Sequence, residues 1–514
     1  MPRLRVAVIG AGIGGLCAAL RLASSGLDVI VLDKGPAPGG KMRQINGVDA
    51  GPTVLTMRHV FDDLFSSTGL CLQDHVSLHR QEVLARHWWP GTGPLDLFSD
   101  RAQSADAIGR FFDARAQREF DAFCKRAELL FDGFRQPVME APTLSMAALT
   151  SHVARNPRLI SPMAPLSTLS GLLDKSFSDP RLRQLFGRYA TYVGGSPYRA
   201  PALLSLIWRA EETGVWVVDG GMHALASAIA DRIAAFGGKF RFNTHVSRIL
   251  TDSAGVTALA LENGSTVPAD LVVFNGDPRA LALGKLGADV AAVAPQTRQK
   301  KRSLSAHVWA FSATPKGPDL AHHNVFFCSD PRQDFSALEA GALPRDTTLY
   351  ICAEDRGLPR PPPAVERFEI ILNAPPLTDR AHQTGEYETC RTRTFQTLRR
   401  FGLTFTPDPP RSALTTPQDF ETLFPGSAGS LYGQSPHGMT AALDRPTART
   451  SVTGLYICGG GCHPGAGVPM AALSGKHAAE AILMDRTSTS KSLQTDMLGG
   501  MSTASPIAEP ARSP

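Results

Sequence analysis

The chain has 514 residues, 43% of them apolar and 19% charged, which excludes a disordered protein and predicts roughly two to four domains. Its 52 basic and 47 acidic residues leave a net charge of +5, which is small for this length and argues against a nucleic-acid-binding protein. No run of about 18 residues is apolar enough to predict a membrane-spanning helix. The eight cysteines are scattered, and Cys458 and Cys462 form the only close pair, so we expect free thiols and no metal site.

Residues 4–34 predict a strand, a glycine-rich turn, a helix and a second strand, which is the unit of a doubly wound α/β domain. The turn carries a G-x-G-x-x-G motif, in which Gly10 allows a tight turn, Gly12 a close approach to a pyrophosphate, and Gly15 close packing of the helix. The helix N-terminus attracts phosphates because its N–H groups are free and the helix dipole is positive there. Asp33 ends the second strand, where a carboxylate accepts from ribose hydroxyls. This segment therefore predicts dinucleotide binding.

The rest of the chain changes pattern several times. Amphipathic helical spacing dominates residues 100–215, and alternating strand and helix patterns return in 215–275. Strand-like pieces separated by Pro-rich loops fill residues 303–425. Residues 455–484 predict a strand, a glycine loop and a final helix. The Ser-, Thr-, Pro- and Gly-rich segment after residue 486 is expected to be disordered.

Two further segments are rich in glycine. Residues 38–43 read Pro-Gly-Gly-Lys-Met-Arg, and residues 49–53 read Asp-Ala-Gly-Pro-Thr. Residues 459–469 read Gly-Gly-Gly-Cys-His-Pro-Gly-Ala-Gly-Val-Pro and enter the last predicted helix, so they offer a second anion or carbonyl-oxygen site. Together with the first turn, these segments resemble the flavin-dependent amine oxidase and phytoene desaturase superfamily over residues 4–485. Cys462 departs from the family pattern, in which Thr or Asp is commoner at this position.

The resemblance implies an α/β fold with a Rossmann-like, glutathione reductase-like FAD-binding domain, an inserted β-sheet substrate domain and a helical, membrane-facing subdomain. It places Arg43 near the FAD pyrophosphate and the backbone of Val246 against the adenine. The residues that it implies for FAD binding are Gly10, Gly12, Gly14, Gly15, Asp33, Lys34, Gly40, Lys41, Arg43, Gly51, Pro52, Thr53, Val246, Gly460, Gly461, Gly467, Val468 and Pro469.

The resemblance also divides the chain into a discontinuous FAD-binding domain, a mainly helical lid that contacts the membrane, a substrate-binding domain and a disordered tail. Their expected residues are, in that order, 1–85 with 215–300 and 445–485, then 86–214, then 301–444, and finally 486–514.

Within the superfamily, residues 34–41 and 459–475 most resemble bacterial 1-hydroxycarotenoid 3,4-desaturases of phototrophic bacteria. This implies an FAD-dependent oxidoreductase that removes two hydrogens from an acyclic 1-hydroxycarotenoid, such as 1-hydroxyneurosporene, in carotenoid biosynthesis. The alternatives are a phytoene-type desaturase or a carotenoid isomerase; a flavin amine oxidase and a carotenoid carrier fit the motifs less well. Reduced flavin would pass its electrons to oxygen or a quinone, and no motif selects between them.

A carotenoid substrate lies in lipid, so we expect a cytoplasmic protein that binds the inner, intracytoplasmic membrane peripherally. The charge-poor stretch 137–172 and two nearby arginines supply the candidate contacts, which are Met139, Leu144, Met146, Leu149, Met163, Leu169, Arg155 and Arg158. The basic run 298–302 is interpreted instead as a solvated loop. The catalytic base is not identified; the titratable residues nearest the motifs are Glu211, Glu212 and His463, and for His463 a positional role is favoured.

Overall fold

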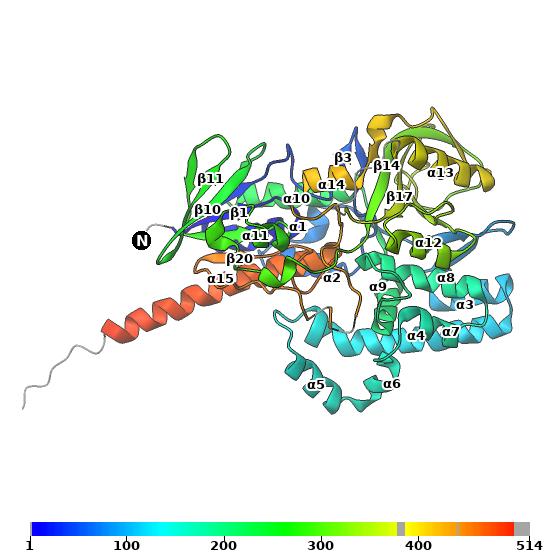
Figure 1. The fold of residues 1–514 in the computed structure, drawn as a ribbon, viewed down its shortest axis with the longest axis horizontal. Helices are drawn as coiled ribbons and strands as arrows, with labels where there is room; N and C mark the ends of the chain where they lie inside the picture. Colours follow the sequence, from blue (N-terminus) through cyan, green and yellow to red (C-terminus); the bar gives the residue numbers. More distant parts are fainter. Residues whose placement is uncertain (1–2, 378–385, 439, 442, 498–514) are drawn as a thin grey trace, which may run out of the picture.

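The computed structural model describes residues 3–377, 386–438, 440–441 and 443–497. Its first layer is a five-stranded parallel sheet (Figure 1) in the order β20-β13-β1-β2-β9, with strands Leu455–Ile457, Leu271–Phe274, Arg5–Ile9, Asp28–Leu32 and Lys239–Arg241. Val6 and Val8 of β1 face one apolar cluster and Ala7 faces another, so the sheet is buried on both sides, as parallel sheets require. The predicted strand, glycine turn, helix and strand of an α/β domain are thereby confirmed, whereas the doubly wound arrangement is not, because helices cover mainly one face of the sheet.

Helices cover one face of this sheet and a smaller sheet covers the other. The helices are α1 (Ile13–Ser24), α10 (Met222–Ala235), α15 (Val468–Met497) and α2 (His59–Ser66), which share one core. The opposite face packs against the antiparallel strands β10 (Val246–Asp252), β11 (Gly255–Leu261) and β12 (Thr266–Pro268), followed by α11 (Pro278–Ala282). The final helix is longer than predicted and includes residues 486–497 of the expected tail; residues 498–514 lie outside the described residues.

A second sheet of eight strands lies beside this unit (Figure 1). Seven strands follow the order β18-β14-β17-β16-β15-β6-β7. Their bounds, in that order, are Thr404–Thr406, Ser305–Lys316, Glu366–Ala374, Leu349–Ala353, His323–Phe326, Val83–Trp88 and Leu95–Phe98. The eighth strand, β19 (Leu414–Thr415), pairs with β14. Its helices are α12 (Pro331–Glu339), α13 (Glu386–Arg400) and α14 (Pro417–Leu423). The expected division of the chain differs here, because β6 pairs in parallel with β15 and so brings residues 83–98 into this sheet.

A helical unit follows β7 in the chain. It comprises α3 (Arg101–Phe111), α4 (Ala114–Phe134), α7 (Leu169–Ser176), α8 (Pro180–Gly187), η4 (Arg188–Val193), η5 (Ala202–Leu206) and α9 (Ile207–Glu212). On α4, Phe120, Phe123, Ala127 and Leu130 are buried at helical spacing, and Asp113 caps the helix by accepting from the Ala116 N–H.

Two short helices extend from this unit. They are α5 (Met146–Arg155) and α6 (Ile160–Met163), which follow the π-helical turn Arg135–Met139 and lie at the lower edge of Figure 1, away from both sheets. None of the helices in the described part of the chain is both long and apolar enough to cross a membrane. The expected surface role of Leu169 is wrong, because this side chain is fully buried in the core of the helical unit.

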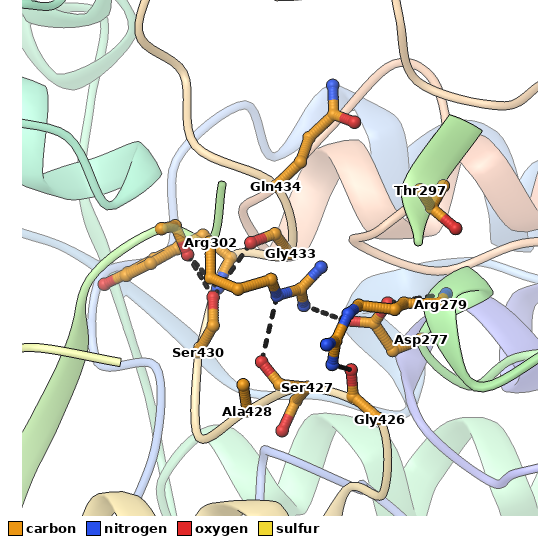
Figure 2. Close-up of polar contacts among 12 residues, drawn as sticks. Asp277, Arg279, Thr297, Arg302, Gly426, Ser427, Ala428, Ser430, Gly433 and Gln434 are labelled. Carbon is orange, nitrogen blue, oxygen red and sulfur yellow. Dashed lines mark hydrogen bonds and ion pairs between the residues drawn. The ribbon is translucent and has the colours of Figure 1, made fainter. Parts of the chain in front are cut away.

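A buried arginine joins the first unit to the second sheet just before β14 (Figure 2). Arg302 forms an ion pair with Asp277, and its Nε donates to the Ser427 carbonyl oxygen at 3.0 Å. Arg279 of α11 donates to the Gly426 carbonyl oxygen at 3.0 Å. The interpretation of residues 298–302 as a solvated loop is therefore wrong at Arg302, whose charge is tolerated inside the protein because a carboxylate neutralises it.

The remaining strands form two short antiparallel ribbons. They are β3 (Gln44–Ile45) with β4 (Val48–Asp49), and β5 (Leu78–Arg80) with β8 (Trp216–Val218). The β8 pairing places the segment after the helical unit against the segment before it, so the chain re-enters the first unit next to where it left.

Candidate functional site

The first glycine turn has the geometry of a phosphate-binding turn. Gly10 has a φ of +98°, and a Cβ at Gly15 would lie 2.2 Å from the Gly10 carbonyl oxygen, so neither position accepts a side chain. Gly12 is the N-cap of α1 and has no side chain to accept from the first N–H groups of the helix, which leaves them for an anion. Asn275, directly after β13, donates from Nδ2 to the Gly10 carbonyl oxygen at 3.1 Å and holds the turn.

Asp33 faces the same turn from the end of β2. Its two carboxylate oxygens accept from the N–H groups of Ala11 and Gly35, each at 2.6 Å. Val246, at the start of β10, lines the same cavity as Asp33. Both residues lie at the carboxyl end of the parallel sheet, which is where open α/β sheets bind their ligands.

The second glycine segment packs directly on the first and adds buried cations. A Cβ on Gly40 would lie 2.9 Å from the Gly12 Cα, so the two segments touch. The Lys41 ammonium donates to the Leu431 carbonyl oxygen at 2.6 Å, and burial lowers its pKa to about 8. The Arg43 guanidinium donates to Thr415 Oγ1 at 2.6 Å, while its buried Nε has no hydrogen-bond partner among the described residues.

These donors indicate an anionic ligand. A buried cation is stable only when an anion or acceptor compensates its lost hydration, and the available partners leave Arg43 Nε unsatisfied. Lys34, also part of this wall, donates to the Thr422 carbonyl oxygen. Partial burial lowers the pKa of Lys34 as well, but this residue is exposed to solvent, so the argument for a bound anion rests on Lys41 and Arg43.

The third glycine segment is held from both sides before it enters α15. The Gly459 N–H donates to Ser474 Oγ at 2.7 Å, and the buried Arg445 donates to the Gly460 carbonyl oxygen at 2.7 Å. A Cβ on Gly461 would lie 2.5 Å from Pro278 Cδ, so this position requires glycine for close packing. The segment thus presents backbone groups to the cavity at the start of the helix.

His463 of this segment has a structural partner. Its Nε2 donates to the Ala141 carbonyl oxygen at 2.8 Å, and its ring stacks on His477 with a centroid distance of 6.2 Å. His477 Nε2 donates in turn to the Glu140 carbonyl oxygen at 3.0 Å. Burial lowers the pKa of both histidines. The two rings therefore tie the third glycine segment to the chain that leads into α5.

One cavity of about 1980 Å³ connects the three glycine segments with the helical unit. It is roughly twice the upper end of the range for small-molecule pockets, so it has room for a cofactor and a further ligand. Every residue implied for FAD binding lines it except Gly15, which lies beneath the first turn. From the end of α4 to α6 the lining side chains are mainly apolar and include Phe134, Met139, Leu144, Met146, Leu149, Val153, Ile160 and Met163.

The two glutamates considered as bases have different surroundings. Glu211 lines the cavity and accepts from the hydroxyls of Tyr189 at 2.9 Å and Tyr192 at 2.5 Å, with Arg188 at 3.4 Å. Glu212 does not line the cavity. It is held by Arg101 at 2.6 Å and by Arg209 at 2.7 Å on the other side of α9. The geometry therefore removes Glu212 from the candidates for the reaction.

One group of three side chains in the described residues has the composition of a metal site. His322, His323 and Cys352 are buried, and their ligand atoms lie within 4.8 Å of one another. Each already has a protein partner: His322 Nδ1 lies 2.6 Å from the Arg356 carbonyl oxygen, Cys352 Sγ lies 3.4 Å from His322 Nε2, and His323 Nδ1 lies 2.6 Å from the Tyr350 hydroxyl. We assign the group to the core of the second sheet.

A parallel sheet with a glycine turn at its carboxyl end, joined to a second sheet over one large cavity, is the architecture of a dinucleotide-binding protein with room for a second ligand. The sequence profile described as flavin containing amine oxidoreductase matches residues 13–483, and the chain belongs to this family. Its cofactor is FAD. The fold matches that of cyclohexylamine oxidase from Brevibacterium oxydans with a TM-score of 0.57, at 17% identity and over 95% of this chain and 100% of that one.

Two curated relatives are similar over almost the whole chain. Hydroxyneurosporene desaturase from Cereibacter sphaeroides is 50% identical over 491 residues, which cover 95% of this chain and 99% of the relative. Hydroxyneurosporene desaturase from Rhodobacter capsulatus is 47% identical over 492 residues, with the same coverage of 95% and 99%.

Proposed function

We propose that the protein is a carotenoid desaturase that uses FAD to introduce the C-3,4 double bond into an acyclic 1-hydroxycarotenoid such as 1-hydroxyneurosporene. The observation that carries this proposal is the continuous cavity from the glycine segments to the apolar wall of the helical unit. Such a wall suits a long hydrocarbon, because each buried CH₂ group contributes about 0.8 kcal/mol to binding. The names of the two relatives support the same substrate class.

In this proposal the residues that line the sheet side of the cavity bind FAD. The free N–H groups at the start of α1 bind the pyrophosphate, Asp33 accepts from the ribose, and the backbone of Val246 contacts the adenine. Lys41 and Arg43 line this side of the cavity and supply positive charge. Bound FAD supplies the acceptor for the hydride that leaves the substrate.

The contribution of the chain itself is orientation and the exclusion of water. The apolar side chains of the helical unit enclose the polyene and leave it free mainly to slide along its own axis. His463 holds the third glycine segment in place through Ala141. Glu211 already accepts from three donors, so we assign it a positioning role and assign no residue as base.

The proposal includes peripheral binding to the cytoplasmic face of the inner membrane through α5, α6 and the loop that follows. Met146 is 55% exposed, Ile160 is 48% exposed and Leu166 is 99% exposed. Met146 and Ile160 also line the cavity, so the exposed apolar surface continues into the substrate space. Arg155 and Arg158 are exposed beside it and suit anionic head groups.

We also propose a functional division of the chain. Residues 1–85, 215–300 and 445–485 supply the FAD-binding domain, 86–214 the lid, and 301–444 the substrate domain. The five strands of the parallel sheet all fall within the first three segments, which supports this division. The exception is the β6–β7 hairpin described above.

Reconstitution tests the activity. The FAD-loaded protein is bound to liposomes and offered 1-hydroxyneurosporene, neurosporene or phytoene, and the absorption spectrum is followed. The expected result is a red shift with the hydroxylated substrate and anaerobic bleaching of the flavin; desaturation of phytoene alone would contradict the proposal. Adding oxygen or a quinone to the bleached protein then identifies the acceptor by the rate at which the flavin colour returns.

A further inference from the structure

One part of the cavity wall carries five polar side chains that are connected by hydrogen bonds in two groups. Thr53 follows β4, Tyr350 lies on β16, Arg188 and Tyr192 lie on η4, and Glu211 lies on α9. All five line the cavity, and Glu211 is only 2% exposed to solvent. An unpaired polar group in an apolar wall weakens the binding of a pure hydrocarbon, whereas it strengthens the binding of a ligand whose own polar group meets it.

The first half of the cluster is a directional chain of hydrogen bonds. The Tyr350 hydroxyl donates to Thr53 Oγ1 at 2.7 Å, and its oxygen lies 2.6 Å from His323 Nδ1. Since the phenol proton is used on Thr53, the N–H of His323 is at Nδ1 and donates to Tyr350. Burial lowers the pKa of His323 well below its ordinary value, so the ring is neutral. Thr53 therefore accepts from Tyr350 and keeps its own proton for a ligand in the cavity.

The second half combines a buried ion pair with two phenols. Arg188 donates to the Tyr192 oxygen at 3.0 Å, and Tyr192 donates to Glu211 Oε2 at 2.5 Å. Arg188 also donates to Glu211 Oε1 at 3.4 Å, and the Tyr189 hydroxyl donates to the same oxygen. The Nε of Arg188 is buried and has no partner within the part of the chain that the structure describes. Because this Nε has almost no accessible surface, the group of this half that can meet a ligand is the carboxylate of Glu211, which lines the cavity and is an acceptor.

The two halves are neighbours. The charge of Arg188 contributes to the low pKa of His323, and Tyr192 contributes to the raised pKa of Tyr350. Together they offer a donor from Thr53 and an acceptor from Glu211, whose carboxylate has about four acceptor sites and uses three of them within the protein. A hydroxyl group is the simplest substituent that accepts one hydrogen bond and donates another.

We infer that this cluster is the binding site for the tertiary hydroxyl of the carotenoid and that it determines which bond is desaturated. The inference rests on the proposed function and adds to it the residues that recognise the substrate. Only two carbon–carbon bonds separate the hydroxyl-bearing carbon from the nearest carbon of the C-3,4 bond. A hydroxyl held beside Thr53, next to Gly51 and Pro52 on the cofactor side, therefore stops the sliding of the polyene with this bond at the cofactor.

The test measures substrate preference rather than activity alone. In the FAD-loaded protein on liposomes, kcat/KM and KM are measured for 1-hydroxyneurosporene, and the inhibition constant is measured for neurosporene, which lacks the hydroxyl. Tyr350→Phe, Tyr192→Phe and Thr53→Val each remove one hydroxyl from the cluster. Tyr387→Phe on α13 is the matched control, because its ring packs on Trp309, in the core of the second sheet.

Loss of one such hydrogen bond is expected to lower the preference for the hydroxylated ligand by roughly five- to tenfold. The Tyr387→Phe control is expected to keep the wild-type preference. Failure of the wild-type protein to desaturate 1-hydroxyneurosporene would refute the proposed function itself. Wild-type activity combined with unchanged preference in all three cluster variants would overturn the hydroxyl site alone. An equal loss of affinity for both ligands would also overturn it, because a purely structural role of the substituted residues predicts that result.

Discussion

Replacing Gly15 with alanine tests the first glycine turn at the position where space is tightest. The added Cβ would lie 2.2 Å from the Gly10 carbonyl oxygen and 2.9 Å from Asn275 Nδ2. Nonbonded carbon and oxygen atoms do not approach this closely, so the turn and α1 must separate. Forcing an extra methyl group into a packed site costs about 1–3 kcal/mol.

If that strain is relieved by moving the turn, the N–H groups at the start of α1 move away from the pyrophosphate. The affinity for FAD is then expected to fall roughly five- to 150-fold, because each 1.4 kcal/mol is about a factor of ten. Flavin fluorescence measures the affinity, and thermal unfolding of the FAD-free protein measures stability separately. Gly93→Ala is the control, since its Cβ would meet no atom within 4 Å. Wild-type FAD affinity in Gly15→Ala would refute the reasoning.

The exposed apolar residues around α5 and α6, the buried Lys41 and the paired Glu212 can each be tested by substitution. Replacing Met146, Ile160 and Leu166 together with serine is expected to weaken liposome binding in a flotation assay at least about tenfold, because each apolar side chain buried in lipid contributes about 1.5–3 kcal/mol. Val365, which is 53% exposed in a loop of the second sheet, is the control position, and Val365→Ser is expected to bind liposomes like the wild type. FAD affinity is expected to fall as pH rises through about 8, because Lys41 loses its proton there and with it the attraction to phosphate. Lys41→Met is expected to abolish this pH dependence in a fluorescence titration. If the pH dependence persists in this variant, Lys41 does not bind the phosphate. Glu212→Ala is expected to lower stability by about 1.5–3 kcal/mol in denaturant unfolding, because Arg101 and Arg209 lose the Glu212 carboxylate and keep only Glu128 as a partner. The KM for the substrate is expected to stay near wild type, and a selective change in KM with normal stability would count against this structural role.

Residues from three glycine-rich segments were expected to share one site, and the structure brings these segments together around one end of the cavity. Gly10 and Asp33 were selected from a local motif and Lys41 from the family resemblance, and all three line the cavity. Asn275 was missed, although its position directly after a predicted strand is a signal that could have identified it.

The substrate side could not be predicted in this way. Tyr350, Arg188 and Thr53 lie far apart in the chain and meet only because β16, η4 and the loop after β4 surround one cavity. No periodicity or motif links them. Burial likewise depends on tertiary structure: Leu169 was expected at the surface and is in the core, and Arg302 was expected in solvent and is paired with Asp277.

The order of strands in the parallel sheet has a consequence for synthesis of the protein. β1 is made first, yet one of its two neighbours is β13, and β13 in turn pairs with β20 near residue 455. The sheet that contains β1 can therefore be completed only after most of the chain has left the ribosome. Pairing between strands so far apart in the sequence is also slow. Until then the nascent chain exposes apolar side chains and an unpaired strand edge, which promote aggregation. We expect truncation before β20 to yield aggregated protein, and FAD supplied during translation to raise the soluble yield of the full chain.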